Sequence, residues 1–377
     1  MKNYTVEEQG PELCARNIKI KVAGVGGGGG NMINHMITVY ELDASVDLIV
    51  ANTDVQDLDK SKAKTRIQIG AKKTKGLGAG MDPEAGEAAA VESKEELKDA
   101  LSNSDIVFVA AGLGGGTGTG AAPIIASAAK EGGAQVVSVV TLPFEFEGSE
   151  RMELALRGLE ELKKESDSVI VIHNDKLMDT LSSAASLAEA YSVVDDILSN
   201  AVRGMVMILL EKGHINIDFA DIRTILGYKG LALMGIGTSE GGDNAILDAF
   251  EAAIESPLLE GNGIERAKGL VVYVKGNRDR MSFKSFSTGM SQIRGRAKNV
   301  GKVIIGNGGD DSMGDRVEIT IIATGFEAPS TASEQPAQTQ KVRRVSNSSF
   351  EFSLDDASGI GGTDYDIPTH KRKRSRD

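Results

Sequence analysis

The chain has 377 residues, more than one hydrophobic core usually serves, so we expect two packed domains plus tails. Its 42 lysines and arginines against 54 aspartates and glutamates give a net charge of −12, which argues against a body that coats nucleic acid. A single cysteine, Cys14, excludes an internal disulfide, and neither a secretion signal nor a bilayer-length apolar run is evident, so we predict a cytoplasmic protein without a transmembrane segment.

The first half of the chain alternates strand-like and helix-like segments. Short, nearly continuous apolar runs are typical of strands covered by helices on both faces, and such alternation predicts a parallel α/β sheet. The predicted strands are Ile18–Val25, Val46–Ala51, Ile106–Ala111, Ala134–Thr141 and Ser168–His173. Ligands of such sheets bind at the carboxyl ends of the strands, so we expect the functional residues there.

A long amphipathic pattern over residues 186–212 predicts a helix that joins the two domains. The segments that follow mix strand and helix patterns and predict a smaller α+β domain. The predicted strands are Leu231–Ile236, Gly269–Val274, Lys302–Gly306 and Arg316–Thr324, and the predicted helices are Asn244–Glu255 and Phe283–Arg296.

Five glycines and two threonines make up Gly114–Gly120, between the predicted strand Ile106–Ala111 and a helix-like pattern. Glycines let backbone N–H groups approach an anion closely, while Thr117 and Thr119 add hydroxyl donors beside the positive end of the following helix. We therefore interpret this segment as a polyphosphate-binding loop rather than a flexible surface turn.

A second glycine-rich turn, Gly24–Gly29, follows the first predicted strand and matches the G-x-G-x-x-G fingerprint of dinucleotide oxidoreductases. Against that class, Asn52 stands where an acidic residue would bind the ribose, and a second phosphate loop is present. Neither loop ends in Gly-Lys-Ser/Thr, which disfavours a Walker-type NTPase. Backbone dipoles, a bound magnesium ion and Arg151 remain to neutralise phosphate charge.

The segment from Ala110 to Pro123, AAGLGGGTGTGAAP, resembles the tubulin signature in the form found in FtsZ, the prokaryotic tubulin-like cell-division GTPase family. The resemblance covers about residues 17–326. It implies a parallel-sheet GTP-binding domain joined by a long central helix to a smaller α+β domain. The other matching segments, in chain order, are Gly26–Asn31, Asn52–Asp54, Gly76–Gly80, Pro143–Arg151, Asn174–Leu177 and Asn216–Asp221.

The resemblance implies that GTP or GDP, with Mg²⁺, lies on the two glycine loops. It places Glu147 and Arg151 near the ribose and phosphates, and Asn174 at the ribose or guanine. The full set of predicted nucleotide contacts is Gly27, Gly28, Gly29, Gly30, Asn31, Asn52, Gly114, Gly115, Gly116, Thr117, Gly118, Thr119, Gly120, Glu147, Arg151, Asn174, Tyr191, Asp195 and Asp196. The four histidines are scattered, and we predict no metal site built on protein side chains.

For the base, the resemblance puts Tyr191 in a stack with guanine and Asp196 in contact with its edge. A carboxylate can accept two parallel hydrogen bonds from guanine N1–H and the amino group, which adenine cannot offer. Asp195 is adjacent, so which of the two carboxylates reads the base stays open. Tyr191 could instead pack in the core.

Asp218 and Asp221 are the predicted catalytic residues. In the family, the equivalent loop enters the nucleotide pocket of the next subunit, where these carboxylates would polarise the attacking water and Asn216 would help hold the loop. Hydrolysis then requires a neighbour, and head-to-tail assembly produces open filaments. The alternative is that both carboxylates only cap a helix that begins near Ile222.

These observations divide the chain into six segments. We place an N-terminal tail at residues 1–16, the GTP-binding domain at 17–188, the connecting helix at 189–212, the GTPase-activating domain at 213–326, a polar linker at 327–363, and a terminal peptide with a basic tail at 364–377. Asp364–Pro368 resembles the peptide through which the family binds membrane-tethering and regulatory division proteins. Here it continues with Thr369 and His370 instead of bulky apolar residues, which departs from the family pattern.

The sequence therefore predicts a GTP-dependent, self-assembling GTPase of the division ring, located in the cytoplasm at mid-cell. Two alternatives remain at this point. One is a filament GTPase of the same superfamily with a role outside division, and the other is the dinucleotide oxidoreductase suggested by Gly24–Gly29.

Overall fold

The computed structural model describes residues 18–40, 43–178, 185–210, 215, 217–228, 230–242, 244–256, 259, 264–277, 281–297 and 300–326. All of them belong to the unit formed by residues 1–329. The predicted tail 1–16, linker 327–363 and terminal peptide 364–377 lie outside the described residues, as do Asn216, His214 and His370.

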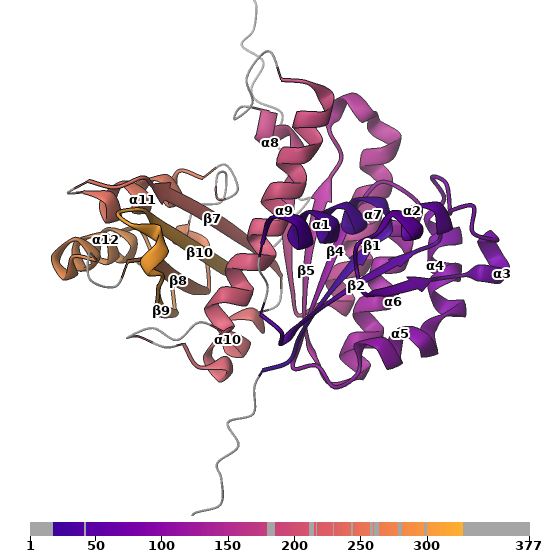
Figure 1. The fold of residues 1–377 in the computed structure, drawn as a ribbon, viewed down its shortest axis with the longest axis horizontal. Helices are drawn as coiled ribbons and strands as arrows, with labels where there is room; N and C mark the ends of the chain where they lie inside the picture. Colours follow the sequence, from indigo (N-terminus) through magenta and orange to yellow (C-terminus); the bar gives the residue numbers. More distant parts are fainter. Residues whose placement is uncertain are drawn as a thin grey trace, which may run out of the picture. The chain divides into compact units, whose positions relative to one another are not determined.

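The strands of the described part form one ten-stranded sheet with the order β3-β2-β1-β4-β5-β6-β7-β10-β8-β9 (Figure 1). The first seven in this order pair in parallel, β10 runs antiparallel to β7 and β8, and β9 is parallel to β8. The strands are β1 (Ile20–Val25), β2 (Val46–Asn52), β3 (Thr65–Gln68), β4 (Ile106–Gly112), β5 (Gln135–Leu142), β6 (Ser168–His173), β7 (Leu231–Ser239), β8 (Gly269–Gly276), β9 (Lys302–Gly309) and β10 (Val317–Phe326).

Helices cover both faces of the parallel part, which explains why its strands are nearly uninterrupted apolar runs. One face packs against α1 and α9, and the other against α4, α5, α6 and α7. The helices are α1 (Gly26–Val39), α2 (Val55–Lys60), α3 (Ala71–Thr74), α4 (Pro83–Glu92), α5 (Lys94–Leu101), α6 (Thr117–Glu131), α7 (Ser149–Glu165), α8 (Asn174–Met178), α9 (Leu187–Leu210), α10 (Phe219–Leu226), α11 (Ala245–Ile254) and α12 (Phe283–Arg296).

The second half of the sheet carries its own core under α11 and α12, around Phe250 and Ile293. It is nevertheless continuous with the first half, because Val169 and Ile170 of β6 pair with the start of β7. The central helix α9 contributes apolar side chains to a cluster that also holds Ile322 of β10, so it packs against both halves (Figure 1). The two expected domains therefore share one sheet and one long helix.

The predicted fold class and each predicted strand are confirmed, with ends that agree within three residues. The short edge strand β3 was not predicted, because Thr65, Arg66 and Gln68 give it little apolar character. Among the described residues, no helix combines the length and apolar character needed to cross a bilayer.

Candidate nucleotide-binding site

A cavity of about 420 Å³ opens beyond the carboxyl ends of β1, β4 and β5, next to the starts of α1 and α6 and the first turns of α9. Open α/β sheets bind ligands at this edge, and the volume suits a ligand of nucleotide size. The predicted contacts that line it are Gly27, Gly28, Asn31, Gly115, Gly116, Thr117, Gly118, Glu147, Arg151, Asn174, Tyr191 and Asp195.

The first glycine loop forms the first turn of α1, which begins without a side-chain cap. Gly26 has a φ of 69°, a conformation that side chains rarely adopt, and a Cβ on Gly28 would lie 3.3 Å from the backbone nitrogen of Gly112. Glycine has a low helix propensity, so this turn is held in helical form by its tight packing on the neighbouring strands. Gly27 and Gly28 of this turn line the cavity, and the first N–H groups of a helix have no partner within the helix.

The second loop leads into α6, whose N-terminus also lacks a side-chain cap. A Cβ on Gly118 would lie 2.4 Å from the carbonyl oxygen of Gly112, whereas a Cβ on Gly115 would meet no protein atom within 4 Å. The Thr117 hydroxyl lies 2.7 Å from that of Thr53 and borders the cavity. Two uncapped helix N-termini thus converge on one space, an arrangement that favours an anion.

The remaining predicted contacts lie outside the cavity lining: Gly29, Gly30, Asn52, Gly114, Thr119, Gly120 and Asp196. Packing requires glycine at two of these positions. A Cβ on Gly29 would lie 2.3 Å from the carbonyl oxygen of Ala110, and a Cβ on Gly120 would lie 1.9 Å from that of Pro83. Asn52 is buried, and its side-chain oxygen accepts a hydrogen bond from the Asp54 backbone at 3.2 Å.

Thr119 has a different role from the expected ligand donor. It is 2% exposed, and its hydroxyl accepts a hydrogen bond from the Gly114 backbone nitrogen at 2.8 Å. Gly114 itself has a φ of 98°. The Thr119 side chain therefore holds the shape of the phosphate loop from inside.

We expect Thr119→Val to lower the free energy of unfolding by about 1–2 kcal/mol, because the buried Gly114 N–H loses its acceptor. Chemical unfolding without nucleotide measures the change. Thr288→Val is the matched control, since that exposed hydroxyl donates only to its own helix backbone at Lys284. Equal unfolding free energies for the two variants would contradict the role given to Thr119.

At the side of the cavity, Arg151 is paired with Glu147, whose other carboxylate oxygen accepts from the Phe144 backbone at 2.9 Å. Glu147 therefore orients the guanidinium rather than offering a free acceptor. The Nε of Arg151 and the Oδ1 of Asn174 are buried and have no hydrogen-bond partner among the described residues. A polar ligand with both an acceptor and a donor would satisfy these two atoms, as a nucleotide does.

The far end of the cavity is built on α9. Tyr191 is 40% exposed, and its ring packs edge-to-face with that of Phe144 at a centroid distance of 5.6 Å, so it borders the cavity instead of filling the core. Asp195, one turn further on, lines the same end, whereas Asp196 points to His35 at 2.5 Å. Of the two adjacent carboxylates, the structure brings Asp195 to the cavity.

Burial raises the pKa of Asp195 to about 6, and the Asp196 charge adds to this shift while His35 opposes it. Burial also raises the pKa of the Tyr191 phenol. Asp195 is thus an acid that changes charge just below neutral pH at the end of the cavity.

Asp218 and Asp221 do not line this cavity. Asp218 is the exposed N-cap of α10, accepting from the Ala220 backbone at 3.4 Å, and Asp221 is paired with Lys302 at 2.7 Å. Their helix follows the end of α9 at Leu210, roughly 18–28 Å along the axis from the α9 residues of the cavity at about 1.5 Å per residue. The capping alternative is thus present for Asp218 alone, because α10 begins at Phe219 and Asp221 lies in its first turn, paired with Lys302. Neither carboxylate lines the cavity of its own chain.

Several lining residues were not among the predicted contacts: Gly80, Gly112, Leu113, Thr141, Pro143, Val194 and Leu198. The Gly80 carbonyl accepts from Gly116 N at 2.9 Å, which ties the segment Gly76–Gly80 to the phosphate loop. That segment belongs to the family resemblance, so a signal for Gly80 was available. Leu198 follows Tyr191 and Asp195 along one face of α9, and helical spacing could have added it.

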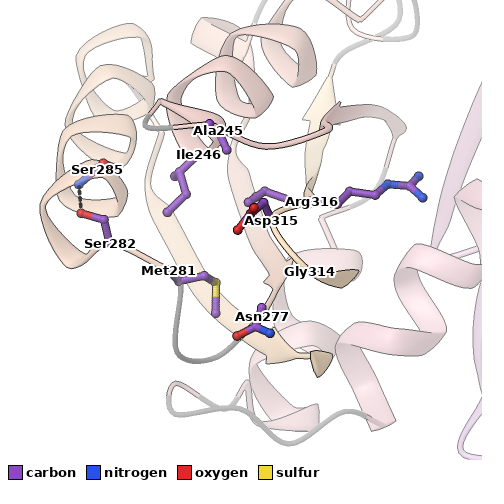
Figure 2. A pocket seen from close by; sticks show the side chains of 11 residues that line it. Ala245, Ile246, Asn277, Met281, Ser282, Ser285, Gly314, Asp315 and Arg316 are labelled. Carbon is purple, nitrogen blue, oxygen red and sulfur yellow. Dashed lines mark hydrogen bonds between the residues drawn. The ribbon is translucent and has the colours of Figure 1, made fainter. Parts of the chain in front are cut away.

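A small cavity, of about 60 Å³, lies near the starts of α11 and α12 (Figure 2). Met281 and Ser282 are on one side of it and Asp315 on another, and Ser282 caps α12 by accepting from Ser285 N at 3.3 Å. This space is too small for a nucleotide. In the described part of the chain, no three His, Cys, Asp or Glu side chains are grouped to hold a metal ion.

Two family models match the chain. The Tubulin/FtsZ family GTPase domain matches residues 19–182, and the FtsZ family C-terminal domain matches residues 230–327. The cell division protein FtsZ of Buchnera aphidicola subsp. Schizaphis graminum is 46% identical over 316 residues, which cover 84% of this chain and 81% of that protein. The chain belongs to the tubulin/FtsZ family.

Other FtsZ proteins agree with this assignment. The cell division protein FtsZ of Pseudomonas aeruginosa is 40% identical over 365 residues, covering 96% of this chain and 90% of that one. The solved structure of an empty FtsZ dimer from M. jannaschii superposes with a TM-score of 0.76 at 40% identity, covering 83% and 90%. The resemblance and fold predicted from the motifs are confirmed, and the chain is a tubulin-like GTPase that binds guanine nucleotide.

Proposed function

We propose that this protein is a GTP-dependent, self-assembling GTPase of cell division, which binds GTP in the 420 Å³ cavity and hydrolyses it with help from the next subunit. Membership of the FtsZ family supports the division role, since the relatives are cell division proteins. It also removes the dinucleotide oxidoreductase from consideration. A filament GTPase with another task is the remaining alternative.

The cavity suggests how GTP is held. The phosphates would lie on the N–H groups around Gly27–Gly28 and Gly115–Gly118, with Arg151 beside them, and the base would lie between Tyr191 and Asp195. Mg²⁺ would neutralise phosphate charge, held mainly by phosphate oxygens because the described residues group no metal ligands. The protein's part is to orient the triphosphate and exclude water.

The cavity itself offers little to activate the attacking water, and this observation carries the proposal. Of its two lining carboxylates, Glu147 is tied to Arg151 and Asp195 lies at the base end. Asp218 and Asp221 stand at the opposite end of α9, where a head-to-tail neighbour could present them to the triphosphate. There they would orient and polarise the water. The cavity of one subunit would contact the Asp218–Asp221 segment of the next, so the two contacting surfaces differ. Such a heterologous contact repeats into an open filament.

The same proposal covers the rest of the chain. We keep the domain limits 17–188, 189–212 and 213–326, and we place the protein in the cytoplasm at the mid-cell division site. Asp364–Pro368 would bind membrane-tethering and regulatory division proteins, a role that falls outside the described residues. The M. jannaschii FtsZ dimer, from a 40% identical relative, supports self-association.

Guanine recognition by Asp195 requires the ionised form, so we expect nucleotide affinity to fall as the pH is lowered through about 6. Because its folded-state pKa is raised, Asp195 favours folding at low pH and this contribution is lost as the pH rises through about 6. Weaker binding in acid is thus not an unfolding effect of this group. Asp195→Asn should bind fluorescent GDP about tenfold to a hundredfold more weakly at pH 7.5, with a flatter pH profile between 5.5 and 8. An unchanged profile would exclude Asp195 from base recognition.

Sedimentation with GTP, GDP and a non-hydrolysable GTP analogue, read beside phosphate release, tests the proposed function. GTP and the analogue should both produce pelletable polymer, with phosphate released only from GTP, and GDP should produce much less polymer. If GTP is hydrolysed but no polymer forms at any of the protein concentrations tested, self-assembly is not part of the function.

A further inference from the structure

His35 has no place in the nucleotide contacts described so far. It lies on α1, its side chain is 20% exposed, and its Nε2 is 2.5 Å from the Asp196 carboxylate on α9. The ion-pair distance is met, but no partner satisfies hydrogen-bond geometry for this buried nitrogen among the described residues. His35 and Asp196 thus join two helices that both border the cavity.

The surroundings of His35 fix its position. The His35 and Tyr40 rings pack edge-to-face with their centroids 6.4 Å apart, and the Tyr40 hydroxyl donates to the Asn200 side chain on α9 at 2.8 Å. Arg203, also on α9, stacks over Tyr40 at 4.7 Å and lies 3.8 Å from Glu318 of β10. The charged and titratable groups around His35 are therefore Asp195, Asp196, Tyr40, Arg203 and Glu318.

Two adjacent carboxylates on one helix turn repel each other, and only one of them reaches the cavity. Asp195 lines it, while Asp196 is turned to His35 with its side chain 45% exposed. His35 and Asp196 act on Asp195 with opposite sign: the first lowers the pKa of Asp195 and the second raises it. Removal of the His35 imidazole would leave Asp195 beside an Asp196 carboxylate that has lost its neighbour.

We propose that His35 is a positioning residue for base recognition, which holds the Asp196 side chain away from the cavity and so leaves Asp195 to face the purine. This inference rests on the proposed placement of guanine between Tyr191 and Asp195. Its consequence is a pH range of nucleotide binding that depends on a residue outside the contact shell.

The test is fluorescent GDP affinity between pH 5.5 and 8 for the full-length protein, His35→Gln, His35→Lys and the double variant His35→Gln with Asp196→Asn. His35→Gln should move the midpoint of the affinity loss upward by roughly half to one pH unit, since the imidazole that lowers the pKa of Asp195 is gone. His35→Lys places an ammonium group beside Asp196 and should keep the midpoint near that of the unmodified protein. Asp196→Asn in the His35→Gln background removes the repelling charge and should return the midpoint to that of the unmodified protein.

A purely structural role for His35 predicts weaker binding by the same factor at every pH in both His35→Gln and the double variant, and that result would overturn the inference. The affinity ratio of GDP to inosine diphosphate, which lacks the 2-amino group, separates this failure from failure of the proposed base contact. If Asp195→Asn lowers that ratio while His35→Gln shifts no midpoint, only the role of His35 is wrong. If Asp195→Asn leaves the ratio unchanged, the base assignment fails and the inference fails with it.

Discussion

Asp218→Asn and Asp221→Asn, made singly, should bind GTP and form sedimentable polymer while releasing phosphate about a hundredfold to a thousandfold more slowly than the unmodified protein. The expected size is that of losing one preorganised group that acts on the reacting centre. Asparagine is as good an N-cap as aspartate, so Asp218→Asn removes charge but not the cap of α10. A steady-state phosphate assay beside sedimentation measures both properties.

Asp310→Asn is the matched control for these variants, because Asp310 also caps a helical turn and also pairs with a lysine, Lys275, at 3.3 Å. It should keep near-normal turnover. Lys302→Ala separates the ion pair from the carboxylate at Asp221, and should retain far more activity than Asp221→Asn if the carboxylate acts on water. Normal turnover in Asp218→Asn and Asp221→Asn would leave the two residues with their capping and pairing roles alone.

Sharing of the site between chains is tested by mixing Asp218→Asn with a variant whose phosphate loop is blocked. An interface that joins the intact cavity of the first to the intact acidic loop of the second should hydrolyse GTP. The rate of GTP hydrolysis by the mixture should therefore exceed the sum of the rates of the two variants measured separately. Strict additivity would argue that each chain completes its own site.

Gly115→Ala should weaken GTP and GDP binding tenfold or more without lowering the free energy of unfolding in the absence of nucleotide. The reason is that a Cβ at Gly115 meets no protein atom within 4 Å and therefore occupies only ligand space. Overpacking a filled site by one methyl group costs about 1–3 kcal/mol. Isothermal titration and chemical unfolding of the same preparation measure the two quantities.

Substitutions of two other glycines serve as controls for Gly115→Ala. Gly295→Ala, on α12, also meets no protein atom within 4 Å but lies outside the cavity. It should leave nucleotide binding unchanged and raise the free energy of unfolding by about 0.5–1 kcal/mol, because alanine favours a helix over glycine. Gly118→Ala places a Cβ 2.4 Å from the Gly112 carbonyl oxygen and should lower both. Full nucleotide affinity in Gly115→Ala would exclude the second loop as a phosphate site.

The sheet and its order of elements could be predicted because buried parallel strands are apolar on both faces and stand out from the chain. The run Ile106–Ala111 is an example. The edge strand β3 could not be found in this way, since it buries mainly Ile67. The shared sheet was missed for a different reason: the pairing of Val169 with Leu231 joins distant segments, and local patterns carry no information about it.

The candidate site shows the same limit at the level of single residues. Glycine spacing locates the loops, but it cannot tell Gly115, which opens to ligand, from Gly120, which allows α6 to pack on the backbone of Pro83. Thr117 and Thr119 look alike in the sequence, yet one borders the cavity and the other is inside the loop. Such differences depend on which neighbour each residue meets in three dimensions.

Phosphate release per molecule, measured over a dilution series that extends below the concentration at which polymer forms, tests the central claim most directly. A cavity that lacks its own water-activating carboxylates predicts a rate per chain that falls towards zero as neighbours are lost, while bound GTP persists. A rate per chain that stays constant through the same dilution would show that one copy holds the whole catalytic apparatus and would contradict the account.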